Sequence, residues 1–167
     1  LHVTRIVAEL AGLIRKYKGK FILSRECRKL LKVGGMPAVY PVLLRTFAKK
    51  FNWGYRDYYP ENGLIQSFFV YTLYLLNRHG DQWRRNTLYE DAFIRAFPSI
   101  VDTMEPATYR TREETIRGMY SQRCLRTFAE FLGLIEIKPD SEDRLGRVFE
   151  LRKTPLLGDA VRFHLST

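Results

Sequence analysis

The chain has 167 residues, of which 46% are hydrophobic, 14% aromatic and 28% charged, and its net charge is +10. This composition excludes a disordered chain, because there is enough apolar surface to offset the entropy of ordering the backbone. No apolar run reaches the roughly 18 residues that a membrane-spanning helix needs, so we expect no insertion into a membrane. Two cysteines are too few for a disulfide framework or a four-thiolate zinc site.

The start of the chain and the cysteines suggest where the protein works. The first residue is Leu1 and not Met, so we expect the natural protein to be longer. No long apolar segment follows, which argues against a secretory signal. Cys27 and Cys124 are then most simply two reduced thiols, and we expect a cytoplasmic protein.

The positive charge is concentrated in the first third of the chain. Residues 1–50 hold 12 lysines and arginines against 2 acidic residues, whereas residues 51–167 hold 16 of each. Such a local field attracts polyanions, and nucleic acid is the commonest, bound through its phosphates. An anionic membrane surface, an acidic protein face or a solvated surface with no partner would also account for the charge.

The first third also predicts two helices and a short strand. Residues 1–16 place apolar side chains three and four positions apart, as on one face of a helix. Residues 17–20 are typical of a turn, and residues 21–23 predict a short strand. Ser24 can cap a basic helix that ends at Gly34-Gly35, and this glycine pair is the best candidate for a domain boundary.

The middle of the chain predicts the core of the fold. Residues 38–51 look helical, with Pro41 in the first turn, where its missing amide matters little. Residues 52–63 form an aromatic loop that includes Arg56. Its rings could stack on unpaired bases, but such rings more often close over the edge of a core. Residues 64–77 are apolar almost all round and predict a central helix.

Two further helix starts follow. Each is a capping box, a threonine followed three residues later by a glutamate: Thr87 with Glu90, and Thr111 with Glu114. The first predicts a helix over residues 88–97. In the second, the apolar face changes direction near residues 118–121, which indicates a kinked helix or two helices.

The last third predicts a hairpin and a short helix. Residues 134–137 and 148–151 alternate between apolar and polar, as strands do, and a polar acidic turn separates them. Residues 156–163 predict a short helix or packed coil.

A helix that leads through a glycine into a hairpin resembles the end of a winged-helix domain, here over residues 86–151. In that family a helix-turn-helix presents its second helix to DNA, and the hairpin is the wing. The resemblance implies that residues 122–132, which end in the run Phe131-Leu132-Gly133-Leu134-Ile135, are the presentation helix. The predicted fold class is mainly α, a helical core with one or two short β-hairpins of winged-helix type.

The same pattern occurs near the start of the chain. Leu10-Ala11-Gly12-Leu13-Ile14 echoes Phe131-Leu132-Gly133-Leu134-Ile135, and residues 19–23 echo residues 146–151. The strand-to-helix step from Ile22 into the helix after Ser24 is also similar to that of MarR and PadR regulators, although Ser24 and Cys27 depart from their pattern. We therefore predict a basic helix-hairpin-helix unit over residues 1–35, the end of a truncated winged helix, and a helical domain over residues 36–167.

The candidate contacts to nucleic acid fall into two sets. The first lies in the basic segment: Arg15, Lys16, Lys18, Lys20, Arg25, Arg28 and Lys29. The second lies on the presentation helix and the wing: Gln122, Arg123, Arg126 and Arg147. Arginine can make paired hydrogen bonds to guanine edges or to phosphates. The helix face that carries Arg123 and Arg126 also resembles an ordinary solvated face, and we favour that interpretation for it.

Nothing in the sequence asks for catalysis. His2, His79 and His164 lack metal-ligand spacing, and no Ser or Cys has the context of a nucleophile. We therefore expect no enzyme, no cofactor and no metal. The expected function is that of a nucleic-acid-binding module, with DNA the expected nucleic acid, in a larger bacterial-type regulatory or mobile-element protein. The alternative is a protein-interaction or scaffold domain of unknown process with no catalytic activity. An acidic protein is the partner that could replace nucleic acid.

Overall fold

A computed structural model describes residues 2–55, 57–105, 109–141, 143 and 146–163. Contacts divide the chain into two compact units, Leu1–Asn52 and Trp53–Thr167, and each is described by itself. The division does not fall at the predicted boundary near Gly34-Gly35, because the chain continues through the glycine pair as a kinked helix. In the described ranges, no helix is both long and apolar enough to cross a bilayer.

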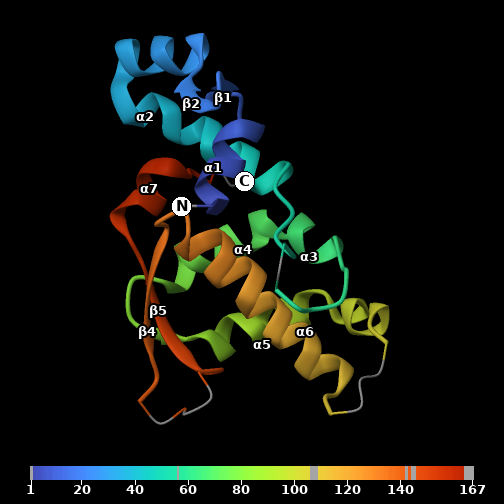
Figure 1. Ribbon diagram of the computed structural model, residues 1–167. Coiled ribbons are helices and arrows are strands. Elements are labelled where there is room, and N and C mark those ends of the chain that lie inside the picture. Colours follow the sequence, from blue (N-terminus) through green and yellow to red (C-terminus); the bar gives the residue numbers. More distant parts are fainter. Residues whose placement is uncertain (1, 56, 106–108, 142, 144–145, 164–167) are drawn as a thin grey trace. The chain divides into compact units, whose positions relative to one another are not determined.

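The first unit combines two helices with a hairpin (Figure 1): α1 (His2–Leu10), β1 (Ile14–Tyr17), β2 (Lys20–Leu23) and α2 (Arg25–Lys49). The predicted helix over residues 1–16 ends six residues early, because Gly12 adopts a φ of +68° that a helix cannot continue. The chain then forms the antiparallel pair β1 and β2, joined by Lys18 and Gly19 with φ of 46° and 78°. Two such residues make the tight turn that suits a twisted hairpin.

A small core holds this unit together. Leu13, Cys27 and Val39 are buried, and side chains from both halves of α2 pack against them. Ser24 caps α2 by accepting a hydrogen bond from the amide of Cys27, as predicted. The helix bends at Gly35, whose φ of 62° breaks the regular backbone, and Pro37 opens the segment that follows. The predicted stop at the glycine pair is therefore a kink.

The second unit is mainly helical and carries a small sheet (Figure 1). Its elements are α3 (Leu64–Ser67), α4 (Phe69–His79), β3 (Arg84–Arg85), α5 (Asn86–Ala96), the 3-10 helix η1 (Pro98–Thr103), α6 (Arg112–Tyr120), the π-helix η2 (Ser121–Glu130), β4 (Ile135–Pro139), β5 (Phe149–Lys153) and α7 (Pro155–Ala160). Together with the first unit this gives a mostly helical chain with two small antiparallel sheets, as predicted.

Aromatic side chains build the core of this unit. The predicted central helix breaks at Phe68 into α3 and α4. Phe93 of α5 stacks on Tyr120 with ring centroids 4.4 Å apart, and Trp53 stacks on Phe128 at 4.5 Å. Trp53 belongs to the aromatic loop, so this ring closes over the core and is not available for stacking on bases. Arg56 of the same loop lies outside the described residues.

The predicted change of apolar face near residues 118–121 has a specific cause. The helix changes from α to π geometry at Ser121, and the amide of Phe131 donates to the carbonyl of Arg126 five residues back. A π-turn holds more residues than an α-turn, so side chains beyond Ser121 move round the helix axis. The capping box of Thr111 and Glu114 at the start of α6 is confirmed, with both hydrogen bonds present.

The sheet of the second unit has the order β3-β5-β4, and all pairs are antiparallel. Ile135 of β4 lies opposite Lys153 of β5, and Arg84 of β3 lies opposite Leu151. The predicted hairpin is therefore confirmed. The two-residue strand β3, which directly precedes α5 in the chain, adds a third strand beside β5.

The two halves of the internal echo have the same local structure. In each, a glycine with positive φ follows a helix, Gly12 at +68° and Gly133 at +73°. The leucine amide after each glycine donates five residues back, to Ala8 or Ala129. These bonds are those of a Schellman helix end.

The match continues beyond the helix end. The carbonyls of Leu13 and Leu134 accept from the amides of Ser24 and Thr154, the residues that precede α2 and α7. Helix, glycine turn, hairpin and helix thus occur twice with the same closing hydrogen bond.

Candidate nucleic-acid interface

The hairpin of the first unit exposes both of its faces. None of its eight strand residues is buried. A two-stranded ribbon usually needs to pack against other elements, because alone it is marginally stable in water. All seven basic side chains of the first predicted set are exposed: Arg15, Lys16, Lys18, Lys20, Arg25, Arg28 and Lys29. Over the ranges that the structure describes, none of the seven forms a salt bridge. Their charge is therefore open to solvent.

The second hairpin has no such surplus. Its charges pair across the strands: Glu136 lies 3.1 Å from Arg152, and Lys138 lies 2.7 Å from Glu150. Both pairs lie at registers where the residues face one another directly. The same kind of ribbon is therefore internally neutralised in one unit and purely basic in the other.

The start of α2 adds to the basic surface of the first unit. Arg25, Arg28 and Lys29 occupy its first turns, where only Glu26 is acidic. The N-terminal end of a helix carries partial positive charge from its open amides, so cations there oppose the helix dipole and lower its stability. The hairpin, the turn and this helix start therefore form one continuous stretch of positive charge along the chain.

The second unit contains a groove of about 380 Å³ beside its hairpin. It lies between the start of α5, the helix formed by α6 and η2, and residues 146–149 that lead into β5. Three residues of the second predicted set line it: Gln122, Arg126 and Arg147. The helix and the residues that lead into β5 thus bring these three together.

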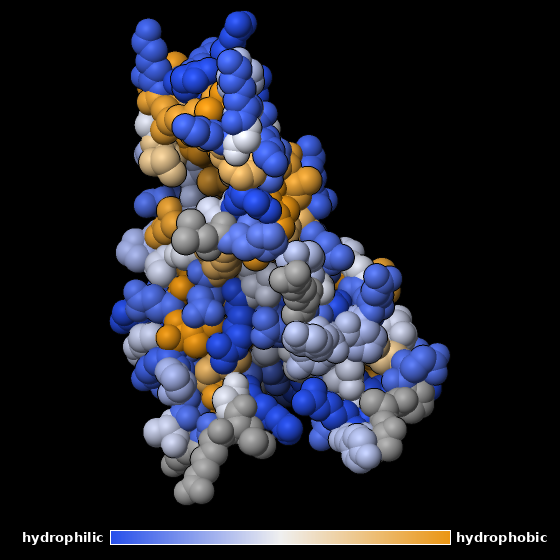
Figure 2. Space-filling model, viewed as in Figure 1, coloured by the Kyte–Doolittle hydropathy of each residue, from blue (hydrophilic) through white to orange (hydrophobic). Residues whose placement is uncertain are grey.

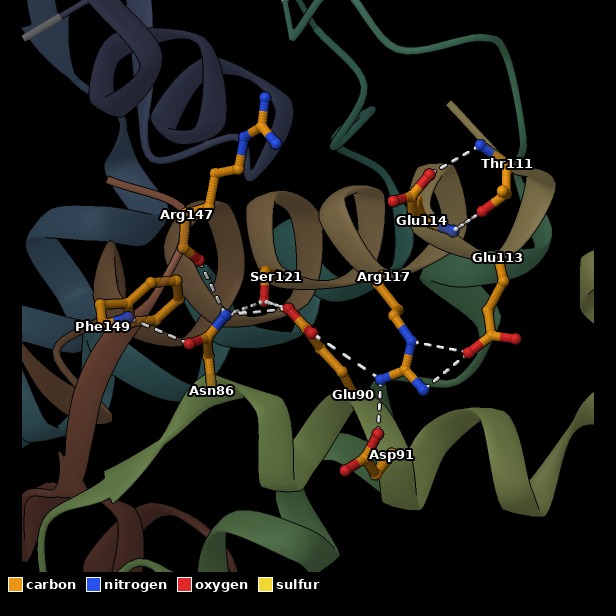
Figure 3. A network of polar contacts seen from close by, with 10 residues as sticks. All are labelled: Asn86, Glu90, Asp91, Thr111, Glu113, Glu114, Arg117, Ser121, Arg147 and Phe149. Atoms are coloured by element: carbon orange, nitrogen blue, oxygen red, sulfur yellow. Dashed lines mark hydrogen bonds and ion pairs between the residues drawn. The ribbon is translucent and has the colours of Figure 1, made fainter. Parts of the chain in front are cut away.

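Three buried polar residues, Asn86, Glu90 and Ser121, line the groove. Figure 3 shows the network of polar contacts that they form. Asn86 donates to the carboxylate of Glu90 at 2.8 Å and to the backbone carbonyl of Arg147 at 3.0 Å, and it accepts from the amide of Phe149. Ser121 donates to the same carboxylate oxygen at 2.6 Å. Asn86 therefore fastens the start of α5 to the start of β5.

Burial changes the chemistry of Glu90. Its carboxyl is shielded from water, which raises its pKa above 4.5, while the hydrogen bonds from Ser121 and Asn86 act in the opposite direction. The predicted capping box of Thr87 and Glu90 is wrong, because α5 begins at Asn86 and Glu90 turns inward to this network. Sequence reasoning missed Asn86, whose only signal is an asparagine at a helix start.

Arg117 reaches the edge of the groove but its charge is largely offset. Its guanidinium lies 2.5 Å from Asp91, 2.8 Å from Glu113 and 3.9 Å from Glu90 (Figure 3). Arg126 and Arg147 have no salt bridge within the described part of the chain. The Arg126 guanidinium lies over the ring of Phe149, 4.3 Å from its centroid.

The structure corrects the prediction for Arg123. Only 4% of its side chain is exposed, and its guanidinium binds both carboxylate oxygens of Asp57, whose side chain is 3% exposed. Further donors go to the carbonyls of Pro60 and Asn62. Because the π-turn rotates this position inward, Arg123 holds the 57–62 loop and cannot reach a nucleic acid.

Two observations concern reactive thiols and metal ligands among the described residues. Burial raises the pKa of the Cys124 thiol to about 12, so it stays protonated and unreactive at neutral pH. Across the described ranges, no three His, Cys, Asp or Glu side chains gather as metal ligands would. What the arrangement can do is bind anions, through the open charges of the hairpin and, more weakly, through the groove.

No protein-family model, no curated protein and no solved structure matches this chain.

Proposed function

We propose that the chain binds nucleic acid, with the hairpin β1–β2 and the start of α2 as the main contact. The observation that carries the proposal is the difference between the two hairpins. One has cross-strand ion pairs, and the other has basic residues with no acidic partner in its strands. A folded surface keeps unpaired cations together at a cost in repulsion, and binding a polyanion relieves that cost.

The ribbon has a shape that suits this role. Side chains of a two-stranded ribbon alternate between its two faces, so its cations can reach phosphates on both sides. The groove of the second unit, with Gln122, Arg126 and Arg147, is a secondary contact in this proposal. The order of elements there, two helices and then a hairpin joined through Gly133, supports a winged-helix interpretation of the second unit.

Salt dependence of binding tests the proposal directly. The chain would be titrated into a fluorescein-labelled duplex and followed by fluorescence anisotropy at several salt concentrations. We expect the logarithm of affinity to fall linearly with the logarithm of salt concentration. The combined variant Arg15→Gln, Lys16→Gln, Lys20→Gln should flatten that slope by about one unit for each phosphate that the protein no longer neutralises, or about three units in all.

A matched control removes the same charge from the same unit. Arg45, Lys49 and Lys50 lie at the other end of α2, and changing all three to Gln should leave the slope nearly unchanged. Equal flattening by both triple variants would mean that only net charge matters, and would remove the hairpin from the interface. Absence of binding by the unchanged chain at low salt would refute the proposal and favour a protein-interaction domain.

A further inference from the structure

The register of the first hairpin sorts its side chains onto two faces. Arg15 lies opposite Ile22, and Tyr17 lies opposite Lys20, so these four share one face. Phe21 pairs with Lys16 on the other face. One face therefore carries an aromatic ring flanked by a cation on its own strand and a cation on the next.

The side chain of Tyr17 is unusually exposed for a large aromatic ring in a strand. Half of its surface is open to solvent, although it lies in a strand where a large ring would ordinarily pack on a core. The Arg15 guanidinium and the Lys18 ammonium each lie 5.6 Å from its ring centroid. Figure 2 shows hydrophobic and hydrophilic side chains intermixed on the surface of this unit, in its upper part.

An open ring among cations suits one kind of polyanion better than another. In single strands the base faces can be uncovered, and an aromatic side chain stacks on them while basic residues track the backbone. In a duplex those faces are covered by neighbouring base pairs, and only groove edges and phosphates remain. In a duplex the ring of Tyr17 would find no uncovered base face, whereas the cations around it would bind the phosphates of either form.

We propose that Tyr17 stacks on an unpaired base of a single-stranded nucleic acid whose phosphates are bound by Arg15, Lys18 and Lys20. This inference rests on the proposed function and names its substrate class. It assigns the aromatic side chain a role that the charge alone does not require.

The test compares three probes with one substitution. Tyr17→Ala would be titrated against a labelled oligothymidylate of about 12 nucleotides, an abasic strand of the same length, and a duplex of the same length. Stacking predicts a loss of at least about fivefold in affinity for the oligothymidylate. The abasic strand and the duplex should bind as before, and the salt slope should not change because no cation is removed.

Two further variants control for folding. Tyr17→Trp keeps a stacking ring and should restore the affinity, with quenching of the added tryptophan when the oligothymidylate binds. Phe21→Ala truncates a similarly exposed ring, 42% open, on the opposite face, and should affect binding less. Equal losses for Phe21→Ala and Tyr17→Ala would overturn the assignment to the Tyr17 face.

The two proposals fail in different ways. If the unchanged chain binds every probe with the expected salt slope but Tyr17→Ala has no effect, the stacking inference is wrong and the proposed function stands. The same holds if Tyr17→Ala weakens binding to the abasic strand as much as to the oligothymidylate. If the unchanged chain binds none of the probes, the proposed function itself is refuted.

Discussion

Replacing Asp57 by alanine tests the structural role that we assign to Arg123. The change removes two of the hydrogen bonds of the guanidinium. Among the described residues, the carbonyls of Pro60 and Asn62 and the sulfur of Met119 then remain around a charge that is 4% exposed. Leaving a buried charge without its partner costs about 3–5 kcal/mol. For a chain of this length that corresponds to a fall in Tm of about 6–20 °C.

Tryptophan fluorescence can follow the unfolding of the second unit, which contains the Arg123–Asp57 ion pair. Both tryptophans of the chain, Trp53 and Trp83, belong to the second unit, and Trp53 is 1% exposed and stacked on Phe128. Urea unfolding followed at these side chains therefore reports on the unit that contains the ion pair, whatever the first unit does.

A double variant supplies the control for Asp57→Ala. Adding Arg123→Met removes the stranded charge and keeps an apolar stem, so the double variant should be more stable than Asp57→Ala alone. The reasoning is refuted if Asp57→Ala costs less than about 1 kcal/mol, or if the two substitutions add without coupling. Binding to nucleic acid, corrected for the folded fraction, should be the same for Arg123→Met and the unchanged chain.

Two further predictions concern the groove and its surroundings. A β-carbon on Gly118 would lie 2.5 Å from the hydroxyl oxygen of Tyr59, so Gly118→Ala should destabilise the second unit by about 1–3 kcal/mol although alanine favours helix. Adding Tyr59→Phe, which removes that oxygen, should recover most of the loss in urea unfolding, and simple additivity would contradict the contact. Burial raises the pKa of Glu90 above 4.5, so the folded state holds this proton more tightly than the unfolded chain, and the contribution of Glu90 to stability is lost as pH rises through that range. Glu90→Gln should therefore gain stability relative to the unchanged chain as the pH rises above about 4.5, and a difference that does not vary with pH would be evidence against it.

Local patterns in the sequence predicted the elements that depend on local physics. The capping box of Thr111 and Glu114, the alternation over residues 134–137 and 148–151, and the cap at Ser24 each involve residues close in the chain, and each is present. The strand β1 was missed because its residues continue an apolar spacing typical of a helix. In the structure the helix ends before this strand, at the turn where Gly12 adopts a positive φ.

The features that were not predicted depend on partners far away in the chain. Arg123 meets Asp57 across 66 positions, and Asn86 meets Phe149 across 63. No spacing rule connects such residues. The π geometry of η2 turns Arg123, a helix position predicted to be exposed, into a buried one. Glu90 has the spacing of a capping residue after Thr87, but it belongs to a buried network because Ser121, 31 positions along the chain, donates to its carboxylate.

The repeated helix-hairpin segment lets the chain serve as its own comparison between residues kept for folding and residues free to diverge. The two copies keep alanine and glutamate in the last turns of the helix, then glycine, leucine and isoleucine, in Ala8-Glu9 with Gly12-Leu13-Ile14 and in Ala129-Glu130 with Gly133-Leu134-Ile135. These are the positions that form the helix end and start the strand. Beyond them the copies part at once: Arg15 stands where the second copy has Glu136, and Tyr17 where it has Lys138. What the two segments share is thus accounted for by architecture, and what sets the first apart is its charge and its open ring.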